Sequence, residues 1–336
     1  MKIVHYEMGL TDQQVMDMYY YMMLARKLDE RMWLLNRAGK IPFLVSCQGQ
    51  EAAQIGAAFA FDTTKDYACP YYRDIGFVLV FGMTPRELML SAFAKAEDPN
   101  SGGRQMPGHF GSKKLRILTG SSPVTTQVPH GAGLALAGKM NQKDFVVYAS
   151  FGEGSSNQGD FHEGANFAGV HRLPLILFCE NNQYAISVPV SKQVGCRRIS
   201  DRAIGYGFPG ETVDGNDPLA VYQVTKKAVE RARRGEGPTL IEAMSYRLVP
   251  HSSDDDDRLY RSKEEVEEAK KNDPLLLFAN YLRSIGLMDM REEEKILDRV
   301  TKEVDDATEY AEKAPYPAPE TALRYVYKEE EGEKWQ

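Results

Sequence analysis

Two short polar stretches follow apolar runs, and together they could bind a metal ion. The first, FGEGSSNQGD, begins at Phe151 and places Glu153 between two glycines. The second, CENNQYAIS, begins at Cys179 and places Asn181 beside Asn182. Carboxylate and carboxamide oxygens suit Mg²⁺, which usually takes one or two protein groups and completes its octahedron with phosphates and water. The two stretches therefore predict a magnesium site if the fold brings them together.

The segments around these stretches alternate between helix-like and strand-like patterns. Unbroken apolar runs are typical of strands buried on both faces, as in parallel sheets covered by helices. The expected elements are, in order, 126–140 (helix), 144–151 (strand), 160–172 (helix), 173–181 (strand), 217–237 (helix) and 238–248 (strand). We therefore predict an α/β fold with a doubly wound, mainly parallel sheet.

This fold would explain how the two polar stretches meet. In consecutive parallel strands joined by a right-handed helix, the carboxyl ends lie along the same edge of the sheet. Glu153 and Asn182 each come just past such an end. If the two strands are neighbours, the side chains converge although about thirty residues separate them.

The flanking glycines extend the predicted site to a diphosphate. Gly152 and Gly154 lack a Cβ and would let the main chain approach a diphosphate, and the following helix could direct N–H groups at the anion. An exposed acidic turn and a nicotinamide-binding GxGxxG loop are alternatives. The second fits poorly, because Asn157 stands where the third glycine would be. The spacing alone leaves these alternatives open.

The whole chain, 1–336, is interpreted as one domain. Its core is expected over about 40–250, with charged amphipathic helices forming a C-terminal extension over about 262–336. At the other end, Thr11 and Gln14 form a capping box before a long helix, and 49–61 is rich in small residues that favour a close-packed helix.

Composition excludes several classes of function. A net charge of -7 gives no basic excess for nucleic acid, and the apolar run 77–83 is too short to cross a membrane. The four cysteines lack CxxC spacing, and Cys179 is expected to be a buried, reduced thiol. We expect a cytoplasmic protein, or a mitochondrial matrix protein if a transit peptide is missing from this sequence.

A third polar stretch, YRLVPHSSDDDDRLYR, contains His251 and four consecutive aspartates. Taken alone, it is typical of a solvated loop. An EF-hand is excluded, because contiguous carboxylates lack the alternate spacing of that loop. A histidine beside a diphosphate could instead donate hydrogen bonds and, titrating near neutrality, transfer protons.

The stretch GEGSSNQGDFHEGANFAGVHRLPLILFCENN resembles the thiamine diphosphate motif, and nearly the whole chain is similar to alpha subunits of the decarboxylating component of 2-oxo acid dehydrogenase complexes. GGRQMPGHFG, SSPVTTQVP, FGEG and PHSSDDDD are most similar to the branched-chain enzymes. The resemblance implies magnesium ligands at Glu153, Asn182 and the Tyr184 carbonyl. The residues that it implies for thiamine diphosphate are Tyr72, Arg73, Ser122, Val124, Gly152, Gly154, Ser155, Asn182 and His251. Those that it implies for potassium are Ser121, Pro123, Thr126 and Gln127.

The resemblance also assigns roles around the histidine loop. His251 would be the catalytic acid or base when the acyl group passes to lipoamide, and Arg247 and Asp255 would order its loop. Ser252 matches the position of a regulatory phosphorylation site in animal relatives. One departure is Glu180, which stands where those relatives carry an arginine, so one phosphate contact is in question. His109 in MPGHFG is expected to approach the site.

A chain of this length is expected to hold only the diphosphate half of the cofactor site, so partner chains are expected. The resemblance implies that a beta subunit completes the cofactor site in an α2β2 heterotetramer and that the acyl group passes to a lipoyl-bearing acyltransferase. The implied activity is that of a 3-methyl-2-oxobutanoate dehydrogenase, acting on branched 2-oxo acids; Phe43, Leu44 and Val45 could suit a branched side chain. A pyruvate or acetoin dehydrogenase is the nearest alternative. A nicotinamide-dependent oxidoreductase and a non-catalytic scaffold are alternatives of other classes.

Overall fold

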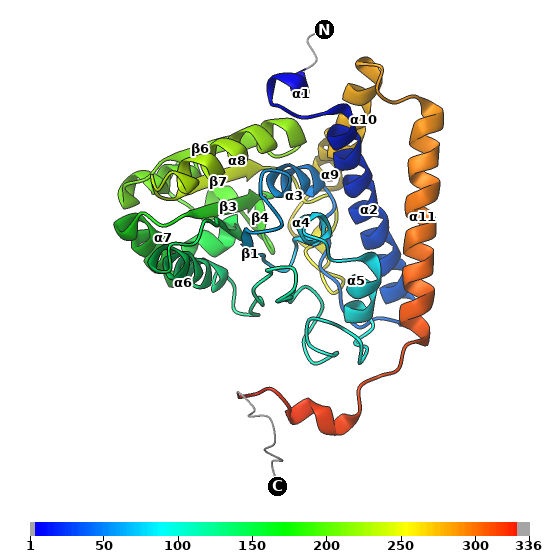
Figure 1. Cartoon of the computed structure of the whole chain (residues 1–336). Helices are drawn as coiled ribbons and strands as arrows, with labels where there is room; N and C mark the ends of the chain where they lie inside the picture. The colour runs from blue at the N-terminus through cyan, green and yellow to red at the C-terminus, as the bar shows by residue number, and fades with distance from the viewer. Residues whose placement is uncertain (1–3, 328–336) are drawn as a thin grey trace.

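A five-stranded parallel sheet forms the centre of the molecule in the computed structural model, which describes residues 4–327 (Figure 1). Its strand order is β1-β2-β3-β7-β6, and β4 and β5 form a separate antiparallel pair. The strands are β1 (Tyr67–Cys69), β2 (Val147–Gly152), β3 (Leu175–Asn181), β4 (Tyr184–Ala185), β5 (Val188–Pro189), β6 (Gly210–Asp214) and β7 (Thr239–Met244). The predicted α/β fold with a doubly wound, mainly parallel sheet is confirmed.

Each central strand divides its side chains between two hydrophobic cores. Tyr148 and Phe178 belong to one buried apolar cluster, whereas Ala149 and Leu177 belong to the other. This alternation follows from the period of two in a strand, and both faces of β2 and β3 are buried. Helices accordingly cover both faces of the sheet (Figure 1).

The helices begin close to the residues that their sequences predict. Thr11 caps α2 with the expected capping box, and the small-residue helix α3 is shorter than expected over 49–61. The helices are α1 (Val4–Glu7), α2 (Asp12–Arg37), α3 (Glu51–Ala58), α4 (Ile75–Val80), α5 (Pro85–Ala92), α6 (Gln127–Met140), α7 (Gly159–His171), α8 (Pro218–Arg233), α9 (Lys263–Lys270), α10 (Pro274–Ser284) and α11 (Met290–Lys313). Short 3-10 helices add to these, including η1 (Glu153–Asn157).

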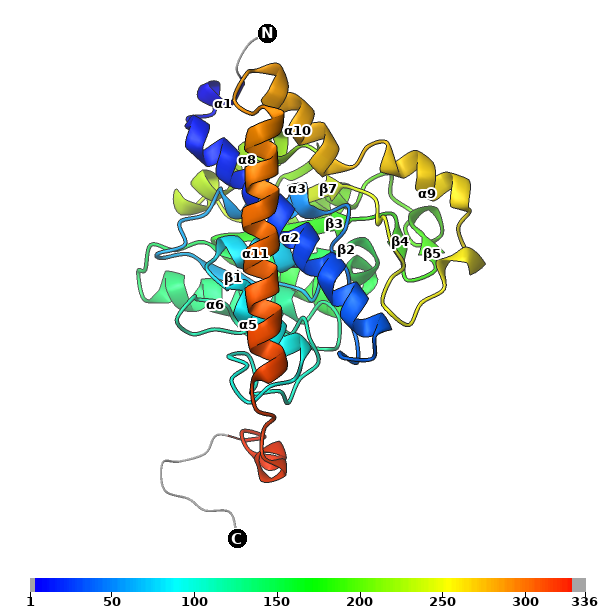
Figure 2. The ribbon, with the colours of Figure 1, turned by 90° about the vertical axis from the view of Figure 1, so that its right-hand side faces the viewer.

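Helices from the two ends of the chain pack together on one side of the sheet domain. The long helix α11 lies along α2 and α5 (Figure 2). Val300 and Val304 of α11 join the same buried cluster as Leu28 of α2 and Phe77 of α4. The interpretation of the chain as one domain stays a prediction. The expected helical extension is present from α9 to α11, and its last part, 328–336, lies outside the described residues. None of the helices within 4–327 is long and apolar enough to span a membrane.

The register of the central strands sets the position of the site. Gly152 at the end of β2 pairs with Glu180 of β3, and Asn181 pairs with Met244 of β7. The residues that follow these strands therefore leave the sheet at the same level. Glu153 and Asn182 come together at this carboxyl edge, as the sequence predicts.

Candidate active site

A cavity of about 480 Å³ opens at the carboxyl edge of the sheet. Its walls come from the segments after β1, β2 and β3, together with the loops around His109, Ser122 and His251. The predicted site residues that line it are Tyr72, Arg73, Ser121, Ser122, Val124, Gly152, Glu153, Gly154, Ser155, Asn182, Tyr184 and His251. Three of the residues proposed for potassium, Pro123, Thr126 and Gln127, do not line this cavity.

Glu153 is a buried carboxylate with weak protein partners. It is 1% exposed, accepts a hydrogen bond from the Asn182 main-chain N–H at 3.3 Å, and accepts another from Gln193 Nε2 at 3.4 Å. Burial raises the pKa of this carboxyl group, because desolvation disfavours its charged form. A cation bound beside it would offset this desolvation. In the part of the chain that the structure describes, no three His, Cys, Asp or Glu side chains form a metal cluster, so a metal here would also need amide oxygens.

The two adjacent asparagines have different environments. Asn181 donates from Nδ2 to Glu242 Oε1 at 2.7 Å and accepts the Gln183 N–H at 3.1 Å, so its side chain secures the turn after β3. Asn182 lines the cavity, and its Oδ1 accepts the Tyr184 N–H at 3.3 Å. Gln183, which follows Asn182, adopts a positive φ of 77°. The next residue, Tyr184, lines the cavity.

The two glycines around Glu153 serve separate purposes. A Cβ on Gly154 would lie 2.4 Å from Cβ of Ala185, so glycine is needed here because two loops pack closely. A Cβ on Gly152 would have only Tyr71 Cε2 within 4.0 Å, and Gly152 lines the cavity. The expected clearance for a ligand therefore fits Gly152, whereas for Gly154 the nearest constraint is packing against Ala185.

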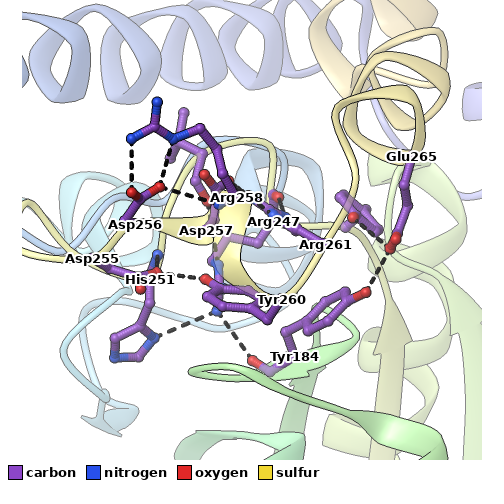
Figure 3. A network of polar contacts seen from close by, with 12 residues as sticks. Tyr184, Arg247, His251, Asp255, Asp256, Asp257, Arg258, Tyr260, Arg261 and Glu265 are labelled. Carbon is purple, nitrogen blue, oxygen red and sulfur yellow. Dashed lines mark hydrogen bonds and ion pairs between the residues drawn. The ribbon is translucent and has the colours of Figure 1, made fainter.

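Two buried arginines lie at or near the cavity: Arg73 lines it, and Arg247 contacts the main chain of Tyr184 and Ile186 in its wall. Arg73 is 1% exposed, donates to the Ser46 carbonyl and lies 5.4 Å from the Tyr72 ring centroid. Arg247 is fully buried and donates to the carbonyls of Tyr184 at 3.1 Å and Ile186 at 2.9 Å (Figure 3). Within residues 4–327, neither guanidinium lies within ion-pair distance of a carboxylate. Two buried cations without a carboxylate partner favour binding of an anion.

His251 lies between these two arginines. Its Nδ1 is 3.4 Å from Arg73 Nη2 and 3.5 Å from Arg247 Nη1, and since guanidinium groups only donate, Nδ1 is the acceptor and the hydrogen is on Nε2. Burial, with Arg73 and Arg247 adding to it, lowers the pKa of His251 to about 3. The expectation that His251 titrates near neutrality concerns a histidine beside a diphosphate, and it stays a prediction.

The aspartates after His251 form an ordered loop, which the sequence alone could not show (Figure 3). Asp255 Oδ2 accepts the His251 N–H at 2.7 Å and the Tyr260 hydroxyl at 2.5 Å, and that hydroxyl also accepts from Arg247 at 2.8 Å. Asp257 pairs with Arg261. The backbone of His251 is thus held by its own loop, as the resemblance implies for Arg247 and Asp255. Ser252 is 7% exposed in this conformation.

The loop from Ser121 to Gln127 closes another side of the cavity. His109 lines the cavity as expected; its Nδ1 contacts the Met106 carbonyl at 2.8 Å and its Nε2 contacts Ser122 Oγ at 2.7 Å. Gln127 is 3% exposed, and its Oε1 has no hydrogen-bond partner in the described part of the chain. Thr125 adopts φ 78°, which is strained for a β-branched residue.

Glu180 points away from the cavity into a buried polar network. It is fully buried and accepts from Gln54 Nε2 at 3.0 Å and from the Tyr71 hydroxyl at 3.1 Å. Asp74 lies beside it and accepts from Ser150 Oγ. Burial raises the pKa of both carboxyl groups, and one oxygen of each has no hydrogen-bond partner among the described residues. A proton held between the two acids would satisfy both oxygens. Glu180 does not line the cavity, so it does not contact an anion there.

Sequence reasoning missed Gln50, Tyr71 and Asp74, all of which support the site. Tyr71 lines the cavity, and Gln50 accepts a hydrogen bond from Asn182 Nδ2 at 3.1 Å. Tyr71 stands next to the predicted Tyr72 and Arg73, which was the one local indication of its role. Gln50 is about 130 residues from its partner, so no local pattern could reveal the contact.

The fold and the cavity define a doubly wound α/β protein with a buried carboxylate and buried cations at the carboxyl edge of its sheet. The sequence matches the family described as "Dehydrogenase E1 component" over residues 19–320, and the chain belongs to this family. Membership favours the metal-diphosphate interpretation over a nicotinamide-binding loop.

Three relatives are similar to this chain over most of its length. The chain is 69% identical over 323 residues to the 2-oxoisovalerate dehydrogenase subunit alpha of Bacillus subtilis (strain 168), covering 96% of this chain and 98% of that protein. It is 40% identical to the 3-methyl-2-oxobutanoate dehydrogenase subunit alpha of Mycobacterium tuberculosis (strain CDC 1551 / Oshkosh), covering 90% of this chain and 80% of that protein. It is 37% identical to the pyruvate dehydrogenase E1 component subunit alpha of Staphylococcus aureus (strain MRSA252), covering 95% of this chain and 84% of that protein.

The buried carboxyl group of Asp74 yields a prediction about stability. Burial and the adjacent Glu180 raise the pKa of Asp74 well above its ordinary value of 3.8. Between the two values the folded state holds a proton that the unfolded state has released, so the stability falls as the pH rises, by up to about 1.4 kcal/mol per pH unit. Asp74→Asn keeps the shape of the protonated acid without titrating. We expect it to be at least as stable as wild type at pH 8 and to lose less stability between about pH 5.5 and 8.5.

Urea denaturation of both proteins across this pH range measures the difference. Ser150→Ala is a matched variant, because it removes the donor to Asp74 and leaves the acid in place. A pH dependence in Asp74→Asn as steep as that of wild type would contradict a shared proton at Asp74.

Proposed function

We propose that this chain is the alpha subunit of a 2-oxo acid dehydrogenase and that its cavity binds the diphosphate of thiamine diphosphate together with magnesium. The observation that carries this proposal is the separation of charge in the cavity. The buried Glu153 carboxylate provides a cation site, and the buried Arg73, close to Arg247 and His251, provides an adjacent anion site. A divalent cation bound to a diphosphate satisfies both.

The proposed magnesium ligands are the Glu153 carboxylate, Asn182 Oδ1 and the Tyr184 carbonyl. Their present contacts fit such a role. Glu153 has only long hydrogen bonds, and Asn182 Oδ1 accepts a single main-chain N–H at 3.3 Å. The Tyr184 carbonyl accepts from Arg247 at 3.1 Å, which leaves its second lone pair for the cation.

The diphosphate would lie between Gly152 and the group formed by Tyr72, Arg73 and His251. Arg73 can match phosphate oxygens with its guanidinium, and His251 can donate from Nε2 because Nδ1 is turned to the arginines. Ser155 and Asn182 would complete this end. Ser122 and Val124, on the loop that closes another side of the cavity, would contact the aminopyrimidine end.

The proposal includes a bound potassium ion. Its ligands would come from Ser121, which lines the cavity, and from Pro123, Thr126 and Gln127, which do not. Its support is Gln127 Oε1, a buried acceptor without a hydrogen-bond partner in residues 4–327. A cation held there would fix the loop that carries Ser122 and Val124.

When bound, thiamine diphosphate supplies the carbanion that attacks the 2-oxo acid and stabilises the decarboxylated product. This chain's residues would hold the cofactor at its diphosphate end and limit the access of water. His251 would hold a proton at Nε2 near the reacting centre. Diphosphate binding would also offset the charge of Arg73, so it would raise the pKa of His251 toward the range useful for acid-base catalysis.

The proposed substrates are branched-chain 2-oxo acids such as 3-methyl-2-oxobutanoate. Support comes from the names of the 69% and 40% identical relatives and from the apolar side chains Phe43, Val45 and Ile186 on the cavity wall. Leu44, in contrast, is buried behind that wall. The 37% identical relative, named for pyruvate, keeps pyruvate as the second candidate.

The proposed partners are a beta subunit, in an α2β2 heterotetramer, and a lipoyl-bearing acyltransferase. The relatives named as alpha subunits support the first partner. A cytoplasmic location belongs to the same proposal, and its support is the bacterial origin of the 69% identical relative. Nucleic acid and membranes have no place in it.

Glu153→Ala tests the proposed metal site. The substitution removes the only carboxylate proposed for the cation, so we expect Mg²⁺-dependent binding of thiamine diphosphate to the heterotetramer to weaken at least about 100-fold. Calorimetric titration measures this affinity. Glu163→Ala changes an exposed glutamate on α7 and is the matched control. A Glu153→Ala complex that keeps wild-type cofactor affinity and activity would favour the non-catalytic scaffold.

His251→Ala separates decarboxylation from acyl transfer. Because His251 is expected to move a proton in the transfer to lipoamide, we expect decarboxylation with an artificial electron acceptor to persist while lipoyl acylation falls by about 100-fold or more. Both rates are measured on the same heterotetramer preparation, with the exposed His130→Ala as control. Equal loss of both rates would argue against a specific transfer role.

Substrate competition distinguishes the two proposed activities. The reconstituted complex should show a higher kcat/KM for 3-methyl-2-oxobutanoate than for pyruvate, since the apolar wall is better filled by a branched side chain; each buried methyl group is worth about a factor of 10. Preference for pyruvate would overturn the branched-chain assignment and leave the 2-oxo acid dehydrogenase assignment intact.

A further inference from the structure

Gln50 lies behind the candidate metal site and is fully buried. It immediately precedes α3 and does not line the cavity. Its Oε1 accepts a hydrogen bond from Asn182 Nδ2 at 3.1 Å and another from the Tyr71 hydroxyl at 3.4 Å. Any influence on the cavity must therefore pass through Asn182 or Tyr71.

The contact with Gln50 decides which end of the Asn182 amide faces the candidate metal. With Nδ2 bound to Gln50, Oδ1 is turned to the Tyr184 main chain, which lines the cavity. The reverse orientation would place Oδ1 against Gln50 Oε1 and Nδ2 against the Tyr184 N–H. It would thus place two acceptors together at one end of the amide and two donors together at the other. It would also turn the amide nitrogen, which has no lone pair for a cation, toward the candidate metal.

Gln50 is itself held by a chain of buried polar groups. The Tyr71 hydroxyl has a single hydrogen, which lies between Glu180 Oε2 at 3.1 Å and Gln50 Oε1 at 3.4 Å. Glu180 also accepts from Gln54 at 3.0 Å. Gln54 Oε1 in turn accepts the Gly76 N–H at 2.9 Å. The two donors near Gln50, Asn182 Nδ2 and the Tyr71 hydroxyl, favour the orientation in which its side-chain oxygen faces Asn182.

We propose that Gln50 is a positioning residue for the magnesium site, which selects the orientation of the Asn182 amide that presents Oδ1 to the cation. The inference rests on the proposed function, because it takes Asn182 as a magnesium ligand. Gln50 would act at a distance from the metal, in the way that groups outside the coordination sphere fix ligand geometry in metalloproteins.

Gln50→Leu removes the acceptor while keeping most of the side-chain volume. In the heterotetramer with thiamine diphosphate present, we expect the Kd for Mg²⁺, measured by calorimetry, to rise about 10- to 100-fold. Gln50→Glu keeps an oxygen for Asn182 Nδ2, so we expect its Kd for Mg²⁺ to stay within about threefold of wild type even if its thermal stability falls. If Gln50→Leu does not assemble, Gln50→Met removes the same acceptor with a flexible side chain.

A double-mutant cycle with Asn182→Asp provides the decisive measurement. A carboxylate presents oxygen at both ends, so its orientation no longer matters to the cation. We expect the fold-change in Kd caused by Gln50→Leu to shrink to less than about threefold in the Asn182→Asp background. A merely structural role of Gln50 predicts the same fold-change in both backgrounds, and that result would overturn the inference.

Glu153→Ala separates a failure of this inference from a failure of the proposed function. If Glu153→Ala abolishes Mg²⁺ binding while Gln50→Leu leaves the Kd for Mg²⁺ unchanged, the magnesium site stands and the positioning role is overturned. If Glu153→Ala also leaves the Kd for Mg²⁺ unchanged, both are overturned.

Discussion

The parallel, in-register pairing of β2 with β3 is the constraint on which the site depends. Because Gly152 is level with Glu180, the chain leaves both strands at the same height, and Glu153 meets the turn that contains Asn182. Side chains alternate along a strand, so a slip by one residue would exchange the two hydrophobic cores as well as displace the site. The same apolar packing that stabilises the sheet therefore fixes the site geometry.

Around this edge the chain buries charges that its own fold does not neutralise. Glu153 has only weak donors, while Arg73 and Arg247 have carbonyl partners but no carboxylate within ion-pair distance in the described residues. Such groups reduce the stability of the free protein. They are understandable if a cation and an anion bind here together. Burial, together with Arg73 and Arg247, lowers the pKa of His251. That pKa should therefore depend on the charge that the cavity holds.

The sequence predicted the central elements well because their patterns are local. The apolar runs of β2, β3 and β7 and the spacing of α6, α7 and α8 follow from burial on both faces of one sheet. It missed β1, which has three residues, and β6, a largely exposed edge strand whose GETVD sequence lacks an apolar pattern.

Within the site, the sequence predicted features set by sheet geometry but not contacts between residues far apart in the chain. The convergence of Glu153 and Asn182 followed from sheet geometry. The role of Arg73 came only from resemblance. Nothing local indicated that Gln50 contacts Asn182 or that Glu180 joins a buried network with Gln54 and Tyr71. Gly154 was assigned to ligand clearance, although its nearest constraint is Ala185, because contacts between separate loops leave no periodic trace in the sequence.

The central claim is that this chain provides the metal and diphosphate half of a site completed by a second chain. Titration of thiamine diphosphate and Mg²⁺ into this chain alone, into the beta subunit alone and into their mixture tests it most directly. The account predicts tight, Mg²⁺-dependent binding only in the mixture, with a stoichiometry of one cofactor per alpha subunit. Equally tight binding by this chain alone would contradict it.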